Sequence, residues 1–215
     1  MLCFLFPLIA IYELGCLIHP QRVIAYAIIR RFLLLFGPVG VWAPGLAIIA
    51  ILLATHIVSG RAWRVRWNRV ALMYLESAVA AVPLLVLNWA VPLNPLAAAG
   101  STFAALAQGV GAGVYEELVF RLILISLILM VGADLFRLHR PTVTIVAVFA
   151  SAILFAVHHH VPIGPEPFDA ARFVFRTVAG VYLAVLFWYR GYALAAGCHA
   201  GYNSLLLLIG FIRPA

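Results

Sequence analysis

Residues 97–132, AAAGSTFAALAQGVGAGVYEELVFRLILISLILMVG, decide the fold class. This stretch is compatible with helix throughout, which gives about 54 Å at 1.5 Å per residue. A helix that crosses hydrocarbon needs only about 20 mainly apolar residues, so the stretch is too long for one perpendicular crossing. We therefore expect two helical pieces, with a break near Gly109, Gly111 and Gly113.

The composition of the whole chain indicates a membrane environment. Hydrophobic residues make up 66% of the 215 residues, charged residues 10%, and the mean hydropathy is +1.12. A soluble domain averages roughly 45–50% apolar and about 25% charged residues. This difference excludes a soluble globule and a disordered chain. The net charge of +7 comes from arginines between apolar runs, as in membrane-flanking segments, and does not indicate nucleic acid.

Other apolar runs of suitable length for crossings are residues 2–18, 41–58, 70–92, 142–159, 172–189 and 191–211, and a shorter run, 23–36, contains two arginines. We predict an all-α, polytopic membrane protein with about seven (six to eight) transmembrane helices and a buried polar cavity. Residues 1–95 form N-terminal helices without a motif, and residues 96–215 hold all the motifs described below.

The first motif is Glu116-Glu117-Leu-Val-Phe-Arg121. Residues four apart share a helix face, so Glu117 and Arg121 can neutralise each other and brace the helix. Glu116 points about 100° away and lacks that partner. An unpaired buried carboxylate suits a general base. A structural ion pair with a spare glutamate is the alternative interpretation.

The second motif, Phe155-Ala-Val-His158-His159-His160, ends an apolar run. His159 shares a helix face with Phe155, so this face carries an aromatic ring and an imidazole. We expect His158 and His160 to be interfacial caps, which the dipole at a helix C-terminus favours. Their substitution is accordingly expected to be mild.

The third motif is His199-Ala-Gly-Tyr-Asn203, inside an apolar helix rich in alanine and glycine. Hydrogen bonding between helices is the alternative use of such residues. The helices of Glu116 and His159 are expected to be antiparallel neighbours, with both residues toward the same membrane face. Asn203 lies about 18 Å along the last helix, deep in the bilayer. We therefore expect a carboxylate, two imidazoles and an amide to converge.

In this order the motifs resemble the EExxxR, FxxxH and HxxxN patterns of the CPBP family, the CAAX protease and bacteriocin-processing (Abi) membrane proteins, to which the type II CAAX prenyl endopeptidases belong. The resemblance covers residues 105–205 and implies an intramembrane endopeptidase, with 96–215 as the catalytic transmembrane core of one integral domain. It also implies the roles of four residues. Glu116 and His159 would activate a water molecule, and His199 and Asn203 would stabilise the oxyanion.

The sequence leaves two interpretations of the cofactor. Glu116, His159 and His199 could complete a zinc site with an open position. However, no H-E-x-x-H pair is present. If Glu116 bound zinc, the reaction would need another general base, and Glu117 is expected to be paired with Arg121. We therefore expect no metal or other cofactor, with zinc as the alternative.

The expected partners are the lipid bilayer and a membrane-associated peptide or protein substrate, and no nucleic acid. Cations that are all arginine, together with abundant alanine, favour a bacterial cytoplasmic (inner) membrane. A transporter is the main rival function, because intramembrane Glu and His also form proton relays. A non-catalytic scaffold or immunity protein is the second. No repeated half supports a transporter, and the complete set of motif residues argues against a degenerate site.

Overall fold

The computed structural model describes residues 1–18, 43–60, 62–91, 101–164 and 166–212. Its helices are α1 (Leu2–Ile18), α3 (Ala43–Val58), α4 (Trp67–Ala90), α5 (Thr102–Glu117), α6 (Ser126–Leu129), α7 (Arg140–Val157), α8 (Ala170–Arg190) and α9 (Tyr192–Ile212). Two π-helical stretches, Leu118–Ile125 and Met130–Leu135, continue α5 through α6. The predicted run 23–36 and the expected boundary after residue 95 lie outside the described residues.

The described residues form an all-α membrane protein, as the composition predicted. Five of its helical segments are long and apolar enough to cross a membrane, and α1 and α3 are shorter apolar helices. Large hydrophobic side chains such as Leu72, Val86 and Ile145 are exposed on the outer faces, where lipid can solvate them. Because helices satisfy their own backbone hydrogen bonds, they are suited to that environment. The seven helical segments described agree with the predicted number.

The predicted break near the three glycines is wrong. Residues 102–135 form one continuous helical segment, with its irregular π-helical turns after Glu117. The glycines allow close packing instead. A Cβ added at Gly111 would meet the ring of Tyr12 on α1, and one at Gly113 would meet the backbone of Ala200 on α9. Small residues at such positions let membrane helices approach closely, so these glycines hold α5 between α1 and α9.

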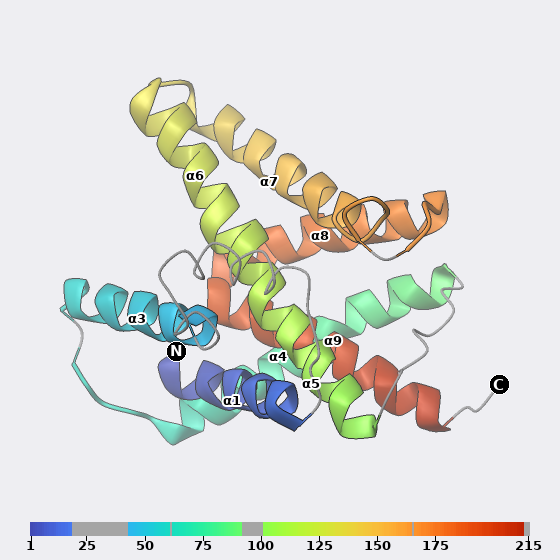
Figure 1. Cartoon of the computed structure of the whole chain (residues 1–215). Coiled ribbons are helices and arrows are strands. Elements are labelled where there is room, and N and C mark those ends of the chain that lie inside the picture. Colours follow the sequence, from blue (N-terminus) through green and yellow to red (C-terminus); the bar gives the residue numbers. More distant parts are fainter. Residues whose placement is uncertain (19–42, 61, 92–100, 165, 213–215) are drawn as a thin grey trace.

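The helix arrangement brings the three motifs to one region. Figure 1 shows the long α5–α6 segment crossing the molecule, with α7 returning beside α6. The segment packs against α9 on one part of its length and against α7 on another, and α8 contacts both α7 and α9. The end of α5, the end of α7 and the middle of α9 therefore meet in the interior.

Candidate active site

Glu117 and Arg121 form the predicted ion pair, with Arg121 Nε 3.1 Å from Glu117 Oε2 and both side chains fully buried. Arg121 Nη2 donates a hydrogen bond to the Gly180 carbonyl on α8 at 3.1 Å. Its guanidinium also lies 4.5 Å from the centre of the Phe155 ring, in cation–π contact. Arg121 thus ties the π-helical segment to α7 and α8 while it balances a buried carboxylate.

Glu117 has a second partner that the sequence did not indicate. Its Oε1 lies 2.9 Å from Nδ1 of His199. Since Glu117 is an ionised partner of Arg121, its carboxylate accepts, and the His199 Nδ1–H donates. The interaction fixes the His199 ring, so that its Nε2 faces Glu116. Glu117 therefore orients one imidazole of the site as well as pairing with arginine.

Glu116 lies at the centre of three imidazoles. Its Oε1 is 3.8 Å from His158 Nε2, and its Oε2 is 3.8 Å from His159 Nε2 and 3.9 Å from His199 Nε2. The Glu116 side chain is only 6% exposed, and its Oε2 makes no hydrogen bond to a described residue. A buried oxygen without a donor requires a partner such as a water molecule or a cation. The structure thus brings Glu116, His159 and His199 together, as predicted, whereas Asn203, the fourth member expected there, contacts Gly109, seven residues before Glu116 on α5.

The hydrogen bonds of the rings indicate what this space can hold. His159 Nδ1 lies 2.8 Å from the Phe155 carbonyl, which only accepts, so this nitrogen carries the proton. In neutral His159 the Nε2 lone pair then faces Glu116. A water oxygen about 2.8 Å from each atom fits between a carboxylate oxygen and a ring nitrogen 3.8 Å apart. Such a water would donate one hydrogen to Glu116 and one to His159.

The charges of the cluster do not cancel. Glu116 and Glu117 together carry two negative charges when ionised, and Arg121 supplies one positive charge. A buried excess charge is costly unless it is neutralised. One further proton within the cluster, or a bound cation, restores neutrality.

The same residues fit a metal ion. Ligand atoms of Glu116, His158 and His159 all lie within 4.8 Å of one another. Tetrahedral zinc with bonds of about 2.0–2.1 Å places its ligand atoms roughly 3.3 Å apart, so small side-chain movements would close the site. The set contains His158, whereas the sequence suggested His199, which nevertheless reaches Glu116 at 3.9 Å.

Asn203 lies one turn beyond His199 and is joined to α5. Its Nδ2 donates a hydrogen bond to the Gly109 carbonyl at 2.9 Å. A Cβ added at Gly109 would lie 3.0 Å from the Asn203 Cβ, so α5 and α9 are in close contact there. A side-chain amide has two N–H donors, and this bond uses one of them.

The expectation that His158 and His160 lie at the interface is wrong, because each is only 4% exposed, but His158 does cap α7, with its Nδ1 3.2 Å from the Phe155 carbonyl. His158 faces Glu116, and His160 Nδ1 lies 3.1 Å from the Pro167 carbonyl. The physical reason is that α7 ends at Val157 and the histidines lie in a turn, where helical spacing no longer decides their directions. The sequence feature that could have indicated a role for His158 is the run of three consecutive histidines after the end of the helix.

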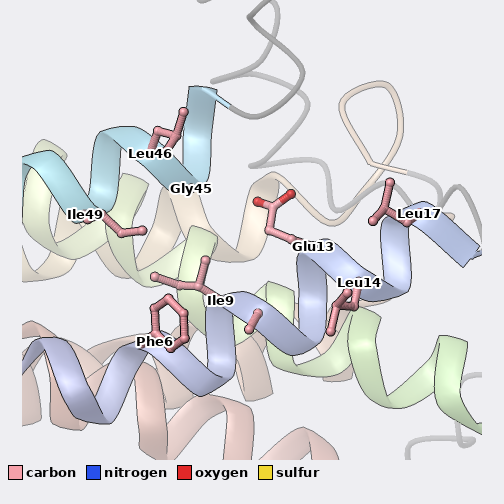
Figure 2. Close-up of a pocket in the computed structure, with 9 residues that line it drawn as sticks. Phe6, Ile9, Glu13, Leu14, Leu17, Gly45, Leu46 and Ile49 are labelled. Carbon is pink, nitrogen blue, oxygen red and sulfur yellow. The ribbon is translucent and has the colours of Figure 1, made fainter.

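A separate cavity of about 550 Å³ lies between α1 and α3. Figure 2 shows its apolar walls, including Phe6, Leu14 and Leu46, with Glu13 beside them. Glu13 Oε1 accepts a hydrogen bond from the Tyr115 hydroxyl at 2.6 Å. No histidine lines this cavity, so among the described residues the convergent polar groups belong to the Glu116 cluster.

Comparison with known families matches residues 98–205 to the family described as type II CAAX prenyl endopeptidase Rce1-like. The matched segment spans Glu116, His159 and Asn203, the first and last of which lie on helices in direct contact. No curated protein and no solved structure gave a match. The match covers half of the chain and agrees with the resemblance seen in the three motifs. The chain therefore belongs to the Rce1-like family of type II CAAX prenyl endopeptidases, a family of membrane peptidases.

Proposed function

We propose that this protein is an intramembrane endopeptidase of the bacterial cytoplasmic membrane, which hydrolyses a peptide bond in a membrane-associated protein or peptide. The observation that carries the proposal is the buried Glu116 carboxylate facing Nε2 of three imidazoles. Family membership indicates peptide-bond hydrolysis as the reaction type. The geometry places a general base, Glu116, and three imidazole nitrogens around one small space. The family name further suggests a substrate anchored by a lipid.

In the proposed reaction, Glu116 and His159 hold the attacking water through its two hydrogens. Glu116 takes one proton as the water oxygen bonds to the carbonyl carbon of the substrate. General base catalysis of this kind contributes about 10²–10⁴ in rate. Glu116 then returns the proton to the leaving amine nitrogen as the carbon–nitrogen bond breaks. The products are a carboxylic acid and an amine, so the atoms of water and peptide are all accounted for.

The oxyanion formed during attack needs donors that are already in place. Asn203 supplies its second amide N–H, because the first is held by Gly109. His199 donates from Nε2 when it carries the extra proton that neutralises the cluster, since its Nδ1–H is held by Glu117. Donors fixed in a low-dielectric site stabilise developing negative charge effectively.

A zinc ion remains the alternative to a purely glutamate-based site. Glu116, His158 and His159 would hold it, with His199 within reach of Glu116. Bound zinc would lower the pKa of a coordinated water and polarise the substrate carbonyl. Glu117 and Arg121 would then keep the same role, fixing the ring of His199 beside the site.

The test is a cleavage assay with protein reconstituted in liposomes. Lipid-anchored and free versions of one peptide library are incubated with wild type and Glu116→Ala, and new termini are identified by mass spectrometry. We expect cleavage that requires Glu116 and favours anchored peptides. Metal content is measured in the same active preparation, before and after chelation. Equal cleavage by wild type and Glu116→Ala contradicts the proposal, and proton-coupled solute uptake without cleavage indicates a transporter.

A further inference from the structure

The loop after α7 carries two histidines of the site, yet the helix itself ends before them at Val157. Nearby contacts hold this loop in place. Glu166 N donates to the His159 carbonyl at 3.2 Å, and Val161 N donates to the Glu166 carbonyl at 2.8 Å. These backbone bonds pair Glu166 with the residues on either side of His160 and leave little freedom to the histidine turn.

The Glu166 side chain anchors the same loop to α8. Its Oε1 accepts from Arg176 Nη2 at 2.7 Å, and its Oε2 accepts from Arg176 Nη1 at 3.0 Å and from Arg172 Nη1 at 3.2 Å. The carboxylate is only 15% exposed, and Arg176 is 14% exposed. Paired, parallel bonds between arginine and carboxylate fix direction as well as distance. Glu166 thus joins His159 to α8 through one backbone bond and a bidentate ion pair.

Helix α8 connects this anchor to the rest of the site. Arg176 and Gly180 are four residues apart, so they lie on one face of α8. Gly180 accepts the hydrogen bond of Arg121, and Arg176 binds Glu166. The same helix face therefore holds both the arginine beside Glu117 and the loop that carries His159.

From these contacts we propose that Glu166, clamped by Arg176 and Arg172, is a positioning residue that sets the distance between the His158–His159 turn and Glu116. This inference rests on the proposed function. Glu166 contacts no reacting atom and acts through His159. Partners that orient active groups typically change activity by about 10- to 100-fold when lost, because a displacement of about 1 Å is enough.

The chain offers a matched control at the other end of α8. Glu76 on α4 binds Arg190, the last residue of α8, in an ion pair that is more exposed than the Glu166 cluster. Glu76→Gln and Glu166→Gln each remove one carboxylate charge and loosen one end of the same helix. A general weakening of α8 would affect both variants alike.

The experiment measures kcat and KM of wild type, Glu166→Gln and Glu76→Gln in liposomes, together with NMR spectra of ¹³C-labelled histidine side chains in detergent. We expect Glu166→Gln to lower kcat about 10- to 100-fold with KM within about twofold, and to shift the signals of His158 and His159. Glu76→Gln should leave both nearly unchanged. Signals are assigned with His158→Gln and His159→Gln.

The outcomes separate the two proposals. If wild type cleaves but Glu166→Gln keeps its kcat within twofold, or matches Glu76→Gln, the positioning inference is wrong. If no form of the protein cleaves any peptide, the proposed function fails, and the histidine signals alone decide whether Glu166 positions the turn. Should Glu166→Gln fail to fold, Arg176→Lys tests the same clamp, because lysine keeps the charge but loses the bidentate geometry.

Discussion

Glu116 and Glu13 are both glutamates within apolar helices, and their surroundings differ. Glu116 is buried and faces nitrogen atoms from the turn after α7 and from α9. Glu13 is partly exposed, accepts a hydrogen bond from Tyr115, and otherwise borders the apolar cavity of Figure 2. An intramembrane carboxylate is costly in either place. Several imidazoles converge on Glu116, and none lines the cavity beside Glu13, so of these two glutamates we expect only Glu116 to be reactive.

The largest expected difference comes from the same substitution in the two regions. Glu116→Gln keeps the shape of the side chain but removes the base, so kcat should fall by about 10²–10⁴. Glu13→Gln should leave kcat within about threefold, because it changes one hydrogen bond, from Tyr115, and removes no group that faces the imidazoles. Cleavage time courses on folded variants, checked by gel filtration, measure both. Equal losses of kcat in the two variants would mean that the imidazoles around Glu116 do not make it functionally different from Glu13.

Arg121→Ala tests whether the buried charge of the first region needs its partner. Removal of one member of a buried ion pair costs about 3–5 kcal/mol, since the remaining charge is uncompensated. Folded yield and thermal stability should therefore fall strongly. Arg190→Ala is the control, because its exposed pair with Glu76 is of the kind worth about 0–1 kcal/mol. A stable and fully active Arg121→Ala protein would show that Glu117 does not depend on this arginine.

Asn203→Ala tests the proposed oxyanion donor. Loss of one such donor costs about 10²–10³ in kcat. Asn88→Ala removes another membrane amide, whose oxygen accepts from the Tyr202 hydroxyl at 3.1 Å, and should affect kcat little. Steady-state kinetics separate the two roles. If Asn203→Ala changes KM and stability but not kcat, its bond to Gly109 is structural only.

His158→Ala sharpens the boundary of the site. His158 faces Glu116 at 3.8 Å, so we now expect a loss of about 10² in kcat, against the mild effect expected from the sequence. His160→Ala should lower kcat less, because its ring binds the Pro167 carbonyl away from Glu116. The same cleavage assay compares them. A larger loss of kcat in His160→Ala than in His158→Ala would mean that His160, rather than His158, belongs to the site.

The helical membrane fold could be predicted from the sequence because a helix needs a run of about 20 mainly apolar residues to cross the hydrocarbon core. The sequence also predicted the Glu117–Arg121 pair, since helical spacing fixes which residues share a face. The meeting of Glu116, His159 and His199 was predicted from their depths along neighbouring helices. The glycines of α5 were misinterpreted as a break, because the same residue type serves close helix packing, and only the partners Tyr12 and Ala200 distinguish the two uses.

Contacts made by residues in irregular backbone, or set by the packing of one element on another, could not be predicted from the sequence. His158 lies in a turn after α7, where no periodicity predicts direction. The bond from His199 to Glu117 depends on how α9 is rotated against α5, which tertiary packing sets. The anchoring of the histidine turn by Glu166 joins a loop to α8 and follows from neither motif nor spacing.

The smallest expected effect concerns the pH dependence of stability at Glu166, which lies in the loop between α7 and α8. Partial burial raises the pKa of Glu166, but the hydrogen bonds and charges of Arg176 and Arg172 outweigh it and hold that pKa below the ordinary value of 4.5. The folded state therefore binds the Glu166 proton less readily than the unfolded state does. The ion pairs thus add stability above about pH 4.5, and this contribution is lost as the pH falls through the lower folded pKa. Thermal unfolding in detergent should show wild type above Glu166→Gln near pH 7, with the gap closing on acidification. A gap that stays constant down to roughly pH 3 would mean that the Glu166 charge does not stabilise the loop.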